Sequence, residues 1–243
     1  MRADAFAIRL RRRGKLEAVD LGVRLCQSAA GSVFPCYLAV AVPVILLSLA
    51  SFEIASWLPT VAIWCAKPWL DRTVLFALSR AAFGEKTRPR DLWEAQRSVL
   101  WQQLFLTWTW RRLSPWRSFT QPVYQLEGLS LWKVRKRVLQ IRAGTTGTAF
   151  TMTSAFSMIE FLLALSVLSL ALWFVPGEAE VDWLRLLSED NLAVAFASAA
   201  AYALVVAFLE PFYVAAGFAL YVNRRVELEA WDVEQELRRA FAR

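Results

Sequence analysis

Long apolar runs alternate with charged stretches along this chain. The longest run, Leu192–Val222, contains a single acidic or basic residue, Glu210, and Pro211 follows it at once. As a helix, its 31 residues would extend roughly 46 Å, which exceeds the bilayer's hydrocarbon core of about 30 Å. This run therefore predicts a membrane-spanning helix that continues beyond the bilayer.

Three further apolar runs have the same pattern. We expect spans at 34–51, 55–83 and 148–175, the second with a cytoplasmic extension because its 29 residues exceed a simple crossing. Pro68 and Pro211 fall inside the two long runs and are expected to kink them, because proline removes a backbone donor. The prediction is an all-α polytopic membrane protein with about four spanning helices, two of them long and proline-kinked.

The remaining segments are amphipathic, basic or acidic. Residues 1–33 and 224–243 alternate apolar and charged positions at helical spacing, which is typical of amphipathic helices on the inner membrane surface. Residues 85–144 are basic and are predicted to form cytoplasmic or interfacial helices, whereas 176–191 form an acidic external loop. The whole chain is therefore predicted to be a single membrane domain.

The basic region 85–144 divides further. Thr87 is predicted to cap the start of a helix, and the uncharged run Ser98–Trp110 is too short to span, so it is placed along the interface. Residues 114–122 break the helical pattern, and an amphipathic helix is expected over 126–142. Its polar side is predicted to contact anionic lipid headgroups or a partner protein. The basic residues of that side are Lys133, Arg135, Lys136 and Arg137.

The distribution of charge predicts the orientation. The expected external segments, 52–56 and 176–191, hold one arginine and six acids, a net charge of −5. The region 85–144 holds 12 basic residues and four acids, a net charge of +8. The positive-inside rule then places both termini and the basic region in the cytoplasm. Interleaved Arg and Trp residues could also stack on the bases of single-stranded nucleic acid. Because so much of the chain is apolar and lipid-facing in character, we expect no nucleic-acid partner.

Composition narrows the chemistry. The chain has no histidine, which excludes histidine-based triads, histidine metal ligands and the usual general base near neutral pH. Cys26, Cys36 and Cys65 lack metal-ligand spacing and are predicted to be packing residues. The sequence contains no glycine-rich phosphate loop and no nucleophile elbow. We therefore expect no enzyme activity, no cofactor and no metal site.

Three charged residues inside the apolar runs are the candidate site: Lys67, Glu160 and Glu210. Each lies 12 or 13 residues from the inner end of its helix, so they are expected at similar depth. A charge at that depth is costly unless it is paired or wetted. Three arrangements are open. Lys67 would form a structural ion pair with one of the two glutamates, or the three residues would form a proton or cation relay. In the third arrangement, an arginine of the cytoplasmic helices would reach Glu210. Asp71 and Arg72 are expected to pair at the cytoplasmic rim.

The two halves of the chain resemble each other weakly. LLSLA at 46–50 matches VLSLA at 167–171, and Lys67-Pro68 corresponds to Glu210-Pro211. A two-fold internal repeat would explain these matches, and chance similarity of apolar sequence is the alternative.

Three segments carry a family resemblance. They are KPWLDRTVLFALSRAAFGE (67–85), RSFTQPVYQLEGL (117–129) and EPFYVAAGFALYVNRRVELEAWDVE (210–234). They resemble a family of uncharacterised bacterial multi-pass inner-membrane proteins, over most of the chain. Members are often encoded near MoxR-type AAA+ ATPases, von Willebrand-type domain proteins and a membrane protein with a transglutaminase-like domain. The arrangement of helices is also similar to the membrane domain of some glycerophosphodiester phosphodiesterases, whose hydrolase motifs are missing here.

The resemblance implies an accessory or scaffold subunit of a complex in the bacterial inner membrane, and it brings no catalytic residues. The first hypothesis is thus a non-enzymatic scaffold that binds a membrane-protein partner or further copies of itself. The alternative is a small oligomeric transporter or channel subunit that uses Lys67, Glu160 and Glu210.

Overall fold

Every regular element in the described part of the chain is helical. The computed structural model describes residues 13–101, 114–129, 131–173 and 192–229. The elements are α1 (Lys15–Ser28), α2 (Ala30–Ala50), η2 (Ser51–Glu53), α3 (Leu58–Ala81), α4 (Pro89–Glu94), η3 (Arg97–Trp101), α6 (Arg117–Leu126), α7 (Leu131–Arg142), α8 (Thr146–Trp173) and α10 (Leu192–Glu229). The all-α prediction is confirmed for these residues.

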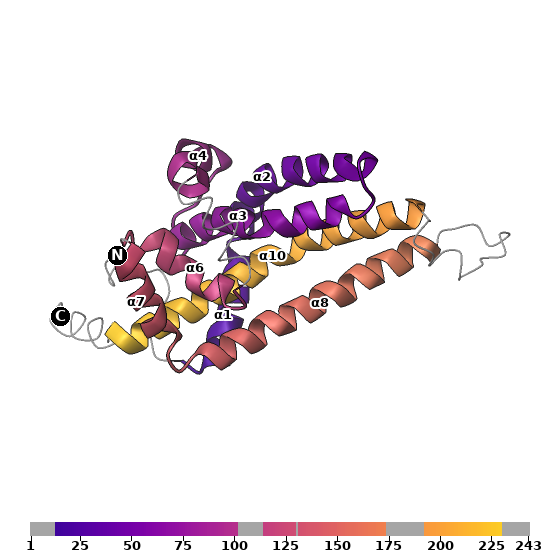
Figure 1. Cartoon of the computed structure of the whole chain (residues 1–243). Coiled ribbons are helices and arrows are strands. Elements are labelled where there is room, and N and C mark those ends of the chain that lie inside the picture. The colour runs from indigo at the N-terminus through magenta and orange to yellow at the C-terminus, as the bar shows by residue number, and fades with distance from the viewer. Residues whose placement is uncertain (1–12, 102–113, 130, 174–191, 230–243) are drawn as a thin grey trace.

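The long helices α2, α3, α8 and α10 run lengthwise beside one another, and the shorter helices gather toward the end where α10 finishes (Figure 1). In the described residues, three helical stretches are long and apolar enough to cross a membrane: Ala30–Glu53, Thr146–Leu170 and Leu192–Glu229. The chain therefore has the architecture of a helical multi-pass membrane protein. α3 falls outside this group because charged residues interrupt its apolar sequence.

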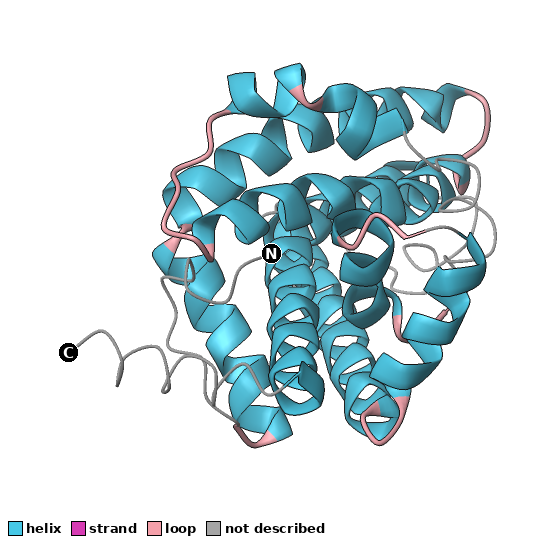
Figure 2. Cartoon of the chain, turned by 90° about the vertical axis from the view of Figure 1, so that its left-hand side faces the viewer, coloured by secondary structure: helices cyan, strands magenta, loops and turns pink. Residues whose placement is uncertain are grey.

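α10 is the central element of the bundle. It packs against α1, α2, α3, α6 and α8, and Figure 2 shows the molecule turned so that the end where α10 finishes faces the viewer. The approach of α1 is close at Gly22, where a Cβ atom would overlap the backbone of Ala215. α6 approaches equally closely at Gly217, where a Cβ atom would overlap Ser118. Small residues thus set the distances between these helices.

The expected spans match the long helices with shifted ends. α2 begins at Ala30, four residues before the expected start at 34, so the predicted helix 1–33 is divided between α1 and α2. α10 continues to Glu229, so the expected helix 224–243 begins as the end of α10. Both α3 and α10 continue as helices through their prolines, Pro68 and Pro211. The expected kinks at these two residues stay predictions. The loop 176–191 lies outside the described residues.

The prediction was wrong for 114–122, which was expected to be a break. Residues 117–126 form α6, with Pro122 inside it. Six consecutive residues of α6, from Ser118 to Val123, are buried, the polar ones and Pro122 included, so tertiary packing holds a helix where the Ser- and Pro-rich composition favours a break. Gly128, with a φ of 60°, then separates α6 from α7, which is why the expected helix 126–142 begins only at Leu131.

The start of α4 also differs from the prediction by one residue. Arg88, not Thr87, is the N-cap, and its backbone N–H donates to Asp91 Oδ2 at 2.9 Å. Pro89 occupies the first helical position, where its missing N–H costs nothing. Of the run predicted to lie along the interface, Ser98–Trp101 belongs to η3 and the rest lies outside the described residues.

Candidate functional site

The structure brings Lys67, Glu160 and Glu210 into direct contact. Lys67 Nζ, on α3, lies 2.6 Å from Glu160 Oε2 on α8 and 2.8 Å from Glu210 Oε2 on α10. The side chains of Lys67 and Glu210 are 9% and 2% exposed, whereas that of Glu160 is 18% exposed. One ammonium group therefore connects three long helices through two carboxylates.

Two residues that were not part of the predicted trio complete the cluster. Arg117, the first residue of α6, places Nη2 2.5 Å from Glu210 Oε1 and Nε 2.8 Å from Asp71 Oδ2. Glu210 thus meets a cation at each oxygen, and Arg117 joins two carboxylates. We call these five residues, Lys67, Asp71, Arg117, Glu160 and Glu210, the ion-pair network.

The prediction that Asp71 and Arg72 form a pair at the rim is wrong, because both side chains are buried. Asp71 is fully buried and pairs with Arg117. Arg72 is 5% exposed, and its Nη2 donates to the carbonyl of Ser98 at 3.4 Å. The reason is tertiary: η3 and α6 pack over the C-terminal half of α3, so a site that would be solvated on an isolated helix is enclosed.

Helix geometry explains why α3 supplies two members of the network. Positions 67 and 71 are one turn apart and share a face, so Lys67 and Asp71 both point toward α6 and α10. The charges are buried, and each pair offsets part of the cost of removing its members from water. Among the five members, three are carboxylates and two are cations, and each carboxylate lies within ion-pairing distance of a cation.

Arg117 also lies against an aromatic ring. Its guanidinium carbon lies 5.4 Å from the centre of the Tyr213 ring. The Tyr213 hydroxyl lies 3.3 Å from Thr153 Oγ1, which also donates to the carbonyl of Pro115 at 2.7 Å. Burial lowers the pKa of Arg117, but Asp71 and Glu210 raise it more, so the pKa lies above its ordinary value and the side chain stays charged.

A cavity of about 650 Å³ adjoins the network. It lies between α3, α8 and α10, because α8 packs along α10 and not closely on α3. The residues of the segment before α6 that line it are Ser114 and Pro115. Its charged lining residues are Lys67, Arg117, Glu160 and Glu210, and its aromatic lining residues are Trp64, Phe156, Phe161, Tyr202 and Tyr213.

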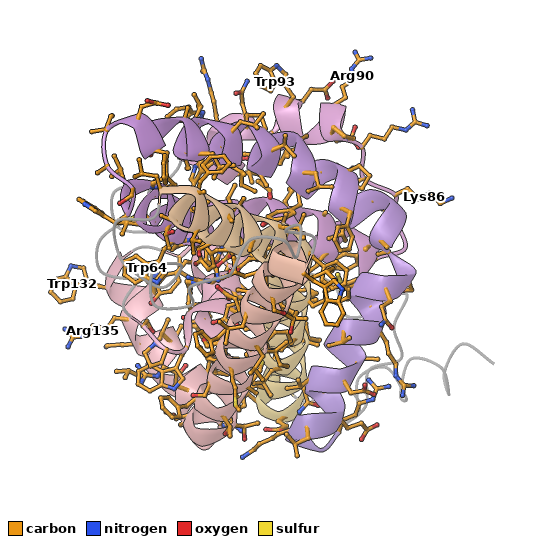
Figure 3. The ribbon with its side chains drawn as sticks, turned by 90° about the vertical axis from the view of Figure 1, so that its right-hand side faces the viewer. Trp64, Lys86, Arg90, Trp93, Trp132 and Arg135 are labelled. Carbon is orange, nitrogen blue, oxygen red and sulfur yellow. The ribbon has the colours of Figure 1, made fainter. Side chains whose placement is uncertain are left out.

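The predicted basic side of α7 is mostly exposed. Lys133, Arg135 and Lys136 are exposed, whereas Arg137 is half-buried and pairs with Glu127, 3.0 Å from Nε to Oε2, and with Glu229. Arg137 is therefore engaged within the protein. Figure 3 shows Trp132 and Arg135 projecting from one side of the molecule, and Lys86, Arg90 and Trp93 projecting elsewhere on its periphery.

The sequence identified three of the five network residues and missed two. The sequence favours the rim for Asp71, because the neighbouring Arg72 offers a local partner. The pattern of 114–122 predicts a break and so gives Arg117 no place in the site, although an arginine that reaches Glu210 is one of the alternatives that the sequence leaves open. The available signal was the stretch 118–126, which has no charge and follows Arg117 directly.

No group of three histidine, cysteine or acidic residues in the described segments is arranged to hold a metal ion. Fold and site thus define a helical membrane protein with a buried ion-pair network beside a cavity. Comparison of the chain with protein-family models, with curated proteins and with solved structures gives no match. The family resemblance therefore stays a prediction.

Proposed function

We propose that this chain is a non-enzymatic scaffold or accessory subunit of a membrane-protein complex, with four crossing helices in the inner membrane of a bacterium. The fourth crossing is α3. It follows α2 through the short turn at η2 and packs along both α2 and α10 (Figure 1). Two of its charged residues, Lys67 and Asp71, pair with residues of α6, α8 and α10. Four crossings would put both termini on the same side, the cytoplasmic side by the positive-inside rule.

The observation that carries the scaffold proposal is the pairing within the ion-pair network. Each of its five members has an ionic partner in the network, as expected for charges that fix the register of helices. The network also joins α6, a helix too short to cross the bilayer, to three long helices. The cytoplasmic helices would then be held rigidly against the membrane part, as a scaffold requires.

The second support is a set of exposed basic and aromatic residues on α7 and near α4. We call it the basic-aromatic rim; its residues are Lys86, Arg90, Trp93, Trp132, Lys133, Arg135 and Lys136. Tryptophan and basic side chains together favour the headgroup level of an anionic membrane surface. The rim would thus contact anionic lipid and the acidic surface of a membrane-protein partner.

The first test is a pull-down in mild detergent from native membranes, read by mass spectrometry for proteins and lipids. We expect a protein partner to co-purify in stoichiometric amount. The variant Arg135→Glu should lose most of the co-purified partner. Arg24→Glu is the matched control, because Arg24 is an exposed arginine of α1, with 73% of its side chain accessible. Retention of the partner by both variants would contradict the role of the rim.

The cavity supports a second candidate, a small oligomeric transporter or channel subunit using Lys67, Glu160 and Glu210. These residues line a cavity between α3, α8 and α10, and a proton or cation relay needs such a space beside its charged groups. A homo-oligomer that carries only lipid in the pull-down would overturn the scaffold proposal and favour this one. The transporter candidate would then be tested by a flux assay in proteoliposomes, in which Glu210→Gln is expected to lose the pH-dependent flux.

A further inference from the structure

The N-terminal part of α8 is firmly attached to the bundle. Met152 is buried in the core. Trp116 Nε1 donates to the carbonyl of Thr146 at 3.0 Å, and Thr153 Oγ1 donates to the carbonyl of Pro115 at 2.7 Å. This part of α8 is therefore held by packing and by hydrogen bonds to the residues that lead into α6.

The C-terminal part of α8, residues 157–173, is attached less firmly. Among the side chains that the structure describes, none in this part is buried. The hydroxyls of Ser166 and Ser169 donate to carbonyls of α8 itself. α8 lies at one edge of the bundle, along α10 and not closely on α3 (Figure 1). Because few buried contacts hold it, this part, which we call the lid, is expected to move more easily than the core.

Glu160 connects the lid to the other long helices. Its Oε2 lies 2.6 Å from Lys67 Nζ on α3, and the hydroxyl of Tyr202 on α10 donates a hydrogen bond to it. Both Lys67 and Glu160 line the cavity, so their ion pair crosses the space between α3 and α8. The residues that the lid contributes to the cavity wall are Ser157, Glu160, Phe161 and Ala164.

This ion pair can separate while the rest of the network stays balanced. Without Glu160, the network has two cations and two carboxylates. Lys67 keeps Glu210 at 2.8 Å, and Arg117 keeps both Asp71 and Glu210. Breaking a buried ion pair is costly when it leaves a charge uncompensated, and here the four remaining charges compensate one another. Glu160 is also the most exposed member of the network, at 18% of its side chain.

We propose that the lid is a movable wall of the cavity and that the Lys67–Glu160 ion pair is the latch that holds it in place. When the pair separates, the lid tilts about the fixed N-terminal part of α8, and the space between α3 and α8 widens. The lid extends about 25 Å, so a tilt of about 10° moves its end by about 4 Å. The proposal is independent of the scaffold proposal, because the other four network members keep α3, α6 and α10 together.

Distances between spin labels test the proposal on the full chain in nanodiscs, in a background in which the three native cysteines are serine. The pair Leu46→Cys and Leu170→Cys joins α2 to the lid, and the pair Leu46→Cys and Phe150→Cys joins α2 to the fixed part of α8. All three positions are exposed. Glu160→Leu removes both the charge and the acceptor for Lys67. We expect it to lengthen the mean distance of the first pair by about 4 Å and to leave that of the second unchanged.

Two further variants separate the latch from other effects. Ser169→Ala is the matched control on the lid, because its hydroxyl bonds within α8, and it should leave both distances as in the wild type. Glu160→Gln keeps an acceptor for Lys67 and should give a smaller shift than Glu160→Leu. Equal distances between positions 46 and 170 in the wild type and in Glu160→Leu would overturn the proposal. An equal shift of both label pairs would overturn it as well, because the whole of α8 would then have moved.

Discussion

Arg117 is the residue whose removal would change the network most. It pairs with Asp71, and it shares Glu210 with Lys67. Buried ion pairs contribute little net stability against apolar replacements of similar shape, but removing one partner leaves a buried charge uncompensated. At this scale, the arginine matters because of the two carboxylates that it neutralises.

Arg117→Met should therefore destabilise the folded protein by about 3–5 kcal/mol, because Asp71 loses its cation and Glu210 loses one of two. Arg135→Met on the exposed side of α7 is the control and should change stability by less than about 0.5 kcal/mol. Denaturant titration in mild detergent, followed by tryptophan fluorescence, measures both.

Adding Asp71→Leu to Arg117→Met should restore part of the lost stability, since the uncompensated carboxylate is then removed. A double variant that is as unstable as the sum of both single variants would show that Arg117 acts through packing alone.

Among the elements, α10 determines where the others lie. It contributes Glu210 to the network, Tyr213 beneath Arg117, and the small residues that α1 and α6 approach. Because Gly22 sits directly over Ala215, the position of α1 depends on the absence of a side chain at one residue. Close contacts of this kind are common between membrane helices.

Two glycine substitutions separate this packing effect from helix propensity. Alanine is favoured over glycine in a helix by up to about 1 kcal/mol, so Gly31→Ala in α2, where a Cβ meets nothing within 4 Å, should be neutral or slightly stabilising. Gly22→Ala should be destabilising despite the same gain, because its Cβ would overlap α10. Thermal unfolding in detergent compares them, and equal midpoints would contradict the close approach of α1.

The whole molecule is a bundle of long helices, and the short helices gather at the end where α10 finishes (Figure 1). Lys67 and Glu210, the equivalent positions of the predicted repeat, bond directly to each other. The helices that precede the two halves make different contacts, however: α1 packs along α10, whereas α7 packs mainly on α6. The internal repeat stays a prediction.

The number of crossings decides on which side of the membrane Lys86 lies. If α3 crosses, a cysteine at Lys86 is cytoplasmic while one at Glu53 is external; if α3 does not cross, both lie on one side. We expect a membrane-impermeant maleimide to label Glu53→Cys in intact cells and Lys86→Cys only after lysis. Both variants are made in a background in which Cys26, Cys36 and Cys65 are serine. Labelling of both in intact cells would rule out the fourth crossing.

The sequence by itself determined the helical class, the long apolar helices and the three charges at similar depth. It did so because bilayer thickness and the cost of a buried charge constrain each helix separately. Only the tertiary structure decided that Arg117 and Asp71 belong with those charges, that 117–126 is a helix, and that a cavity separates α3 from α8. These features depend on contacts between segments far apart in the chain, and a pattern within one segment carries no information about the face that another segment will cover.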